Sequence, residues 1–251
     1  MLVEPMGWAA LSLFGSQFFI VMARLSLLIF MLPGIGEQVI PVRVRVLVLL
    51  SLSLAFTSMG IVAPVPILPL AGFLSVIVGE IAIGFCLGVS LRLSIWILSI
   101  VGSIVAQSIG LAQFLGVGLE TEAQTLTSNL LGMAGAAILL TANYHVSAFE
   151  GFLQLYGQVP MGGYGLIELS ALIEAFFAAF NFALNLAWPF VTVSLIYNIS
   201  LGFINKAMPQ LMVAFVGAPF MVGAGVFILT VSVTSLLLVW KDRLPDFVPW
   251  M

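Results

Sequence analysis

Long runs of apolar residues, each almost free of charge, constrain this chain more than any other feature of its sequence. They cover residues 8–32, 44–63, 70–91, 93–113, 126–146, 170–204 and 211–240. A bilayer core about 30 Å thick is crossed by roughly 20 helical residues, so the first five runs have the length of a membrane span. Because lipid cannot hydrogen-bond the backbone, the runs predict α-helices and an all-α, polytopic membrane protein.

The composition agrees with this class. Of the 251 residues, 62% are hydrophobic and 7% are charged, whereas a soluble domain carries about 25% charged residues. The formal net charge of -3 and the lack of a basic cluster argue against nucleic acid as a partner. The single cysteine, Cys86, excludes an intramolecular disulfide and a cysteine-based metal cluster.

The last two runs are longer than a bilayer requires. As one helix, 170–204 extends about 50 Å at 1.5 Å per residue. It must therefore tilt strongly, break near Pro189, or project beyond the lipid while covered by protein. The run 211–240 raises the same question, with Pro219 as its candidate kink. Overlong apolar helices favour a subunit buried among partners over a free-standing bundle.

Charges between the runs give weak support to one orientation. With seven spans and the N-terminus outside, most basic residues lie on one side, as the positive-inside rule requires, but Lys206 lies on the other. Those on the shared side are Arg43, Arg45, Arg92, Lys241 and Arg243. A six-span arrangement stays open, in which 70–113 or the final runs are divided differently.

Glu80 lies in the middle of an apolar run, and Arg24 and Arg92 lie nearer the ends of theirs. An ionisable residue within such a run is costly, so it implies a partner or a wet cavity. Glu80 is then either an ion or proton site or a carboxylate tied into a structural network. The second interpretation is favoured, because no other acidic residue shares its run.

Polar residues also gather on one helical face of the run 170–204. Asn181, Asn185, Pro189 and Thr192 share this face by their spacing. Their side chains need hydrogen-bond partners or water, so the face should not point at lipid. Packing between helices is favoured over the wall of a pore.

Motifs of catalysis are missing from the sequence. It contains no H-E-x-x-H zinc site, no G-x-S-x-G nucleophile elbow and no P-loop. Its two aspartates, Asp242 and Asp246, both lie in the C-terminal tail, and the one histidine, His145, cannot form a His-rich metal site. We therefore expect that the protein is not an enzyme and binds no cofactor. The classes of function that remain are transport and a role in assembly.

Five segments in order along the chain carry a family resemblance. They read PGIGEQVIPVRVRVLV (33–48), GEIAIGFCLG (79–88), AQSIGLAQFLGVG (106–118), ANYHVSAFEGFLQLYGQVPMGG (142–163) and INKAMPQLMVAFVGAPFMVGAGVFIL (204–229). Together they resemble the FliR family of flagellar type III export proteins. The chain departs from the family at Lys206, where arginine is usual, and at Met212, where asparagine is common.

The resemblance implies a core subunit of the export gate in the bacterial inner membrane, at the flagellar basal body. Such a subunit joins FliP- and FliQ-like subunits, works beside FlhB- and FlhA-like proteins, passes unfolded substrates and hydrolyses nothing. It implies one membrane domain over 1–251, with a FliP-like region over residues 1–165 and a FliQ-like region over residues 166–251. The related injectisome stays open, as does a secondary transporter or small-molecule channel, although no inverted repeat is found.

The resemblance also gives a role to a loop near 106–122 that is too apolar for water and too rich in glycine for a helix. It implies a plug that closes the lumen of the gate. The plug residues are Gly110, Phe114, Leu115, Gly116, Val117 and Gly118. The glycines allow the backbone to turn and be displaced, and the apolar side chains would seal the lumen. The alternative is a re-entrant loop packed permanently against its own helices.

Four charged residues complete the expected sites. The resemblance implies that Arg43, Arg45 and Lys206 lie near the cytoplasmic side of the gate or at joins between subunits. Glu80 is expected to lie in a buried polar contact.

Overall fold

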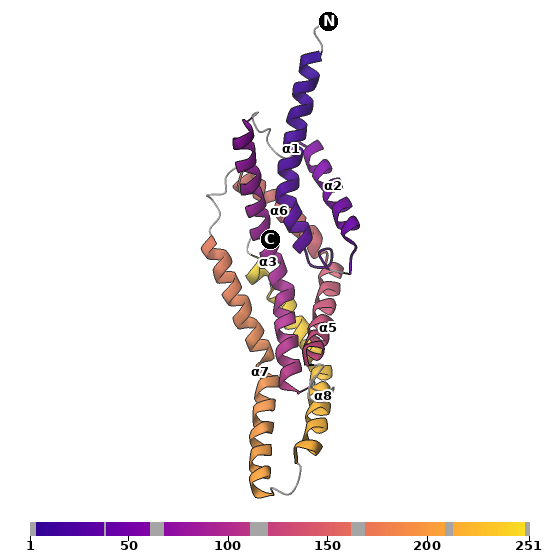
Figure 1. The fold of residues 1–251 in the computed structure, drawn as a ribbon, viewed down its shortest axis with the longest axis vertical. Coiled ribbons are helices and arrows are strands. Elements are labelled where there is room, and N and C mark those ends of the chain that lie inside the picture. The colour runs from indigo at the N-terminus through magenta and orange to yellow at the C-terminus, as the bar shows by residue number, and fades with distance from the viewer. Residues whose placement is uncertain are drawn as a thin grey trace. The chain divides into compact units, whose positions relative to one another are not determined.

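A computed structural model describes residues 4–37, 39–60, 68–110, 120–161, 169–208 and 213–248. Within these ranges the regular elements are helices, so the all-α fold predicted from the sequence is confirmed (Figure 1). They are α1 (Glu4–Met31), α2 (Val42–Ser58), α3 (Leu70–Ser108), α5 (Glu120–Thr141), α6 (Tyr144–Gln158), α7 (Leu169–Ala207), α8 (Val213–Asp242) and the 3-10 helix η3 (Leu244–Phe247).

Four of the described helices are long and apolar enough to cross a membrane, which confirms a polytopic membrane protein. The spans are Ala10–Met31, Leu70–Ser108, Ser170–Ala207 and Gly217–Asp242. The pair Leu126–Thr141 and Tyr144–Gln158, bent by 68° at its break, adds a fifth if it counts as one span. For the described residues, the seven spans counted from the sequence are therefore too many.

The sequence left open whether 70–113 is divided at Arg92. The division into 70–91 and 93–113 is wrong, because α3 is one helix of 39 residues. Arg92 divides the two apolar runs, but arginine is a good helix former and carries no signal to end a helix. Neither proline nor a glycine pair stands beside it. At 1.5 Å per residue α3 extends about 58 Å, roughly twice the bilayer core.

Neither proline in the last two helices ends its helix. Pro189 lies inside α7, which has 39 residues, and Pro219 lies inside α8, which has 30. Proline removes one backbone donor, and membrane helices tolerate this loss where neighbouring groups satisfy the freed carbonyl. A break at Pro189 is thus excluded for the run 170–204. A strong tilt and a protein-covered projection remain as explanations of its length.

The chain folds into two compact units, each assembled from separate parts of the sequence. Unit 1 comprises Met1–Leu93, Leu139–Ala175 and Val248–Met251. Unit 2 comprises Ser94–Ile138 and Phe176–Phe247. The core of each unit is described by itself.

Glycines of α3 bring its backbone against α1 in unit 1. A Cβ added at Gly84 would collide with the carbonyl oxygen of Arg24, and one at Gly88 would lie 2.7 Å from the carbonyl oxygen of Leu27. Leu25 and Leu28 of α1, beside this contact, are fully buried. Small residues allow close approach of membrane helices, and here they do so within one chain.

Small residues join α3 to α5 in unit 2. A Cβ at Gly102 would lie 2.6 Å from the Cα of Ser128. The Ser128 hydroxyl donates to the carbonyl oxygen of Ser99 at 2.9 Å, and its Oγ lies 2.7 Å from the Oγ of Ser103. In the same unit, the fully buried indole of Trp240 donates through Nε1 to the carbonyl oxygen of Ser94 at 2.8 Å.

Replacing Gly84 with alanine should destabilise the chain by about 1–3 kcal/mol, because the added methyl group must displace the backbone of α1. The matched control is Gly157→Ala on α6, where nothing lies within 4 Å of the added Cβ. That control should be neutral or stabilising, since alanine favours the helix. Thermal unfolding of the detergent-solubilised variants measures the difference. Equal melting temperatures for the two variants would contradict the close contact.

Candidate functional site

A buried ion pair links α1 to α3 in unit 1. The side chains of Arg24 and Glu80 are both 0% exposed. Arg24 Nε donates to Glu80 Oε2 at 2.5 Å, and Arg24 Nη2 donates to Glu80 Oε1 at 3.1 Å. Two parallel bonds between a guanidinium and a carboxylate are the strongest form of this contact, because both groups are ionised and planar.

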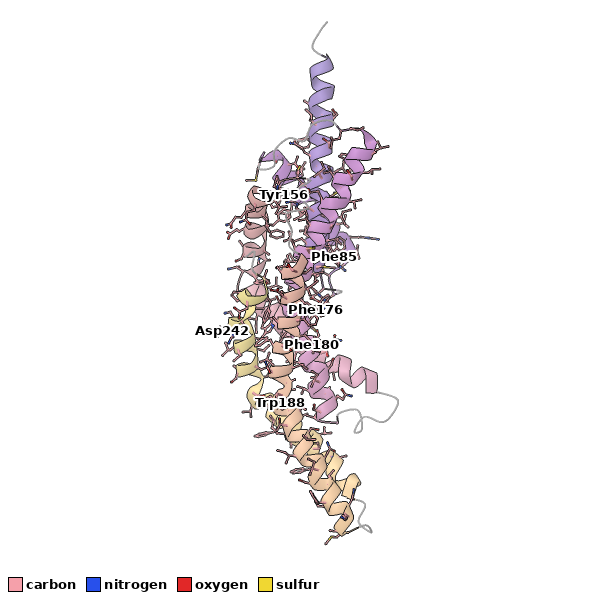
Figure 2. The ribbon with its side chains drawn as sticks, turned by 90° about the vertical axis from the view of Figure 1, so that its left-hand side faces the viewer. Phe85, Tyr156, Phe176, Phe180, Trp188 and Asp242 are labelled. Atoms are coloured by element: carbon pink, nitrogen blue, oxygen red, sulfur yellow. The ribbon has the colours of Figure 1, made fainter. Side chains whose placement is uncertain are left out.

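The end of α6 completes the surroundings of Arg24. Nη1 of Arg24 donates to the carbonyl oxygen of Val159, directly after α6, at 3.1 Å. The guanidinium carbon lies 4.1 Å from the ring centroid of Tyr156, which Figure 2 labels on α6. A cation is favourable both at a helix C-terminus and over an aromatic face. Arg24 therefore connects three helices through its one side chain.

The aromatic side of this site extends to α2. The ring of Phe152 meets that of Tyr156 edge-on at 5.2 Å and stacks on that of Phe56 at 6.1 Å. Phe152 is fully buried and Phe56 is 8% exposed. Such aromatic pairs stabilise a core by about 0.5–1.5 kcal/mol beyond their buried area. Residues from α1, α2, α3 and α6 thus form one connected cluster around the ion pair.

This geometry suits a structural role, in which the ion pair holds α1, α3 and the end of α6 together. Removing two charges from water costs several kcal/mol for each ion, and only good geometry with further hydrogen bonds offsets that cost. Both oxygens of Glu80 face the guanidinium, and a third arginine donor reaches a backbone carbonyl. Among the described residues, no three His, Cys, Asp or Glu side chains come together as a metal site requires.

Two further arginines, Arg92 and Arg45, form hydrogen bonds with the segment between α1 and α2. Arg92 on α3 donates to both carboxylate oxygens of Glu37, at 2.5 and 3.3 Å, and these side chains are 22% and 28% exposed. Arg45 on α2 donates through Nε and Nη2 to the carbonyl oxygen of Ile40, at 3.2 and 3.0 Å. Its guanidinium carbon also lies 5.4 Å from the ring centroid of Phe30.

The remaining basic residues expected at subunit joins lie on the surface of the chain. Arg43 is exposed near the start of α2, and Lys206 is exposed in the last turn of α7. Arg45 is half-buried by the contacts just described. Contacts of these residues with other subunits stay a prediction.

Of the expected loop near 106–122, residues 106–108 belong to α3 and residues 120–122 belong to α5. Of the plug residues, only Gly110 lies within the described part of the chain. Gly110 follows α3 with a φ of +68°, a conformation that favours glycine. Its N–H donates to the carbonyl oxygen of Gln107 at 3.2 Å. Phe114, Leu115, Gly116, Val117 and Gly118 lie outside the described residues, so the plug also stays a prediction.

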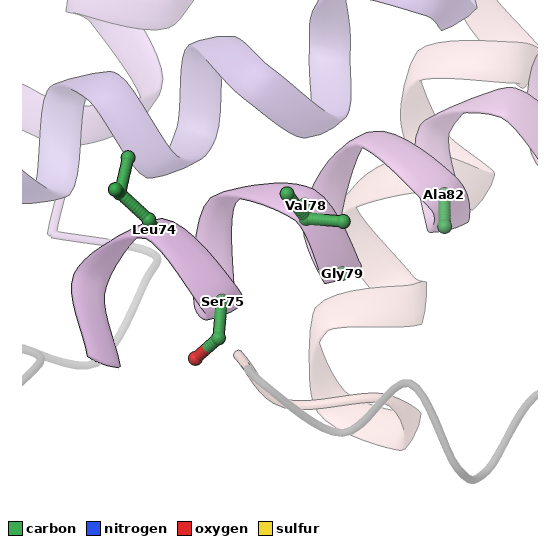
Figure 3. A pocket seen from close by; sticks show the side chains of 5 residues that line it. All are labelled: Leu74, Ser75, Val78, Gly79 and Ala82. Carbon is green, nitrogen blue, oxygen red and sulfur yellow. The ribbon is translucent and has the colours of Figure 1, made fainter. Parts of the chain in front are cut away.

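A cavity of about 500 Å³ lies along α3 in unit 1. Figure 3 shows its lining side chains, which all belong to this helix. They are Leu74, Ser75, Val78, Gly79 and Ala82. One hydroxyl and no charged group face the cavity, so its lining offers little to orient a polar substrate.

Comparison with known proteins gives a consistent match along the chain. The family model described as Bacterial export proteins, family 1, matches residues 16–246. The chain is 28% identical over 230 residues to flagellar biosynthetic protein FliR of Caulobacter vibrioides, an alignment that covers 89% of this chain and 91% of that protein.

Two further relatives carry the same name. The FliR protein of Aquifex aeolicus is 27% identical over 227 residues, which cover 89% of this chain and 88% of that protein. The FliR protein of Escherichia coli K12 is 26% identical over 215 residues, which cover 83% of this chain and 81% of that protein.

Replacing Arg24 with leucine should cost roughly 3–5 kcal/mol of stability, because the carboxylate of Glu80 is left buried without its partner. The double variant Arg24→Leu, Glu80→Leu should be more stable than either single variant, since it buries no charge. Melting temperatures of the four proteins in detergent give the coupling between the two residues.

The matched control for this cycle is Arg92→Leu, which breaks an ion pair that water reaches. It should cost no more than about 1 kcal/mol. A double variant that loses as much stability as the two single variants combined would contradict the coupled pair.

Proposed function

The chain belongs to the bacterial export proteins of family 1, and we propose that it is the FliR-type core subunit of a flagellar type III export gate. The observation that carries this proposal is the extent of the match, which runs from residue 16 to residue 246. The resemblance to the FliR family that the five segments predicted is confirmed by this match and by the FliR relatives.

We propose that the subunit assembles with FliP- and FliQ-like subunits in the bacterial inner membrane, at the flagellar basal body, beside FlhB- and FlhA-like proteins. Two properties of α7 support a protein environment. Its span extends over 38 residues, about 57 Å at 1.5 Å per residue, which is more than lipid can cover. Only 22% of its most apolar window is buried within the chain, so partner subunits would cover the rest.

In this proposal the subunit is a passive component of a conduit for unfolded flagellar proteins and hydrolyses nothing. The FliP-like region, residues 1–165, and the FliQ-like region, residues 166–251, correspond to the two kinds of neighbour. Arg43, Arg45 and Lys206 lie at subunit joins or near the cytoplasmic side. Glu80 acts through its pair with Arg24, by holding α3 against α1.

We further propose that the loop near 106–122 is the plug of the gate. The described residues at its two ends support this role. Gly102 and Ser103 on α3 pack against Ser128 on α5, so the helices that precede and follow the loop lie side by side. A loop held at both ends by packed helices can be displaced by a passing chain and then return, while its apolar residues seal the lumen.

Co-expression with FliP- and FliQ-like subunits tests the proposed assembly. The tagged full-length chain should purify in a stable complex with both subunits. Expressed alone, it should melt at a lower temperature in detergent, because its long apolar helices then lack cover. Deletion of its gene should abolish motility, and the wild-type gene should restore it. A chain that is monodisperse alone and recovers neither subunit would favour the transporter interpretation.

Deletion of residues 112–118 should raise the ion conductance of the assembled gate, because the apolar seal is removed. Conductance of the purified complex in planar bilayers measures the effect. The matched control, Gly157→Ala on α6, should leave conductance at the wild-type level. If a correctly assembled deletion variant conducts no more than the wild type, the loop does not close the lumen.

A further inference from the structure

One face of α7 within unit 2 carries three polar side chains, two of which the described part of the chain leaves exposed. Asn181, Asn185 and Thr192 follow one another at intervals of four and seven residues. At about 100° per residue these positions fall within roughly 40° of one another around the helix. Both asparagines are exposed and Thr192 is half-buried. These three residues are called the polar seam.

The opposite face of α7 is the packed one. Ala179, Ala183 and Ala187 are 3%, 0% and 1% exposed. They lie roughly 120–180° around the helix from the three seam residues. The polar seam therefore points away from the interior that these alanines enter. Amides on that side cannot be satisfied by the core of the same unit.

Ring contacts of α7 within unit 2 also lie off the seam. The ring of Phe182 lies 5.5 Å from that of Phe247 in η3, and the ring of Tyr197 stacks on that of Phe220 in α8 at 6.5 Å. Neither contact covers Asn181 or Asn185.

The two asparagines differ from the threonine in their hydrogen bonding. Thr192 donates from Oγ1 to the carbonyl oxygen of Trp188 at 2.9 Å, so its hydroxyl is satisfied within α7. The side chains of Asn181 and Asn185 form no hydrogen bond with the part of the chain that the structure describes. Each amide brings two donors and one acceptor, and leaving these groups unpaired in lipid is costly.

Large apolar side chains border the seam. Phe177, Leu184 and Trp188, on one side of it, are 60%, 40% and 66% exposed. Figure 2 labels Trp188 on α7. A border of this kind excludes water when another helix packs on it. On the other side, the small and exposed Ala178 leaves room for close approach.

We infer that the polar seam docks a membrane helix of another subunit, which presents amide or hydroxyl side chains one helical turn apart to Asn181 and Asn185. The inference rests on the proposed function for the existence of that subunit. Residues 175–205 of α7 carry no charged side chain, so the partner needs neutral hydrogen-bonding groups and no counter-charge. The seam fixes which face of α7 meets the partner, and the apolar border keeps water from the amides.

Co-expression of the full chain with FliP- and FliQ-like subunits provides the test. The double variant Asn181→Leu, Asn185→Leu should lower the recovered complex about tenfold, while the amount of the chain in the membrane stays unchanged. The double variant Asn181→Ser, Asn185→Ser keeps donors and acceptors and should recover much of the assembly. Asn205→Leu removes an exposed amide from another side of α7 and should assemble as the wild type does.

Accessibility to water separates this inference from a seam that lines an aqueous passage. Asn185→Cys in a Cys86→Ser background, within the assembled complex, should be protected from a membrane-impermeant thiol reagent. Labelling of that cysteine would overturn the inference in favour of a passage, and wild-type assembly of the leucine variant would overturn it in favour of lipid. Failure of the wild-type chain to assemble would instead refute the proposed function.

Discussion

The interior of a bilayer neither donates nor accepts hydrogen bonds, so each polar group on a long apolar helix must find its partner in protein. Several hydroxyls of the described helices meet the requirement locally, as Thr230 and Ser232 do by donating to carbonyl oxygens four residues earlier. Arg24 meets it over a long distance in sequence, through Glu80, Val159 and the ring of Tyr156. In the proposed assembly, polar groups left unsatisfied among the described residues are where other subunits would pack.

Length imposes a second requirement of the same kind. Helices α3 and α7 each have 39 residues, about twice what lipid covers, and they remain apolar along their course. An isolated chain would leave such surface in water at one end or the other. The proposed assembly with other apolar subunits would remove this conflict, which connects the proposal to the physical character of the helices.

The sequence predicted the helical class because apolar runs in lipid have few alternatives, and it identified Glu80 as a buried charge that needs a partner. It could not identify Arg24 as that partner, because the pairing of residues 56 positions apart depends on how α1 and α3 pack. A charge between two apolar runs was mistaken for a helix boundary at Arg92, where helix propensity and the contact with Glu37 decide otherwise. Pro189 was a weak guide for a similar reason, since its surroundings allow α7 to continue.

Glu80, Gly84 and Gly88 follow one another at single helical turns on α3. Either glycine accommodates a neighbouring backbone, so the glycines alone would tolerate sliding of α1 along α3 by one turn, about 5.4 Å. The ion pair does not tolerate it, because Arg24 would then lose its carboxylate within an apolar interior. The glycines alone would permit two positions of α1 along α3, one turn apart. The pair of Arg24 with Glu80 selects one of them. Large motions of these helices have to occur by tilting together, with their mutual register preserved.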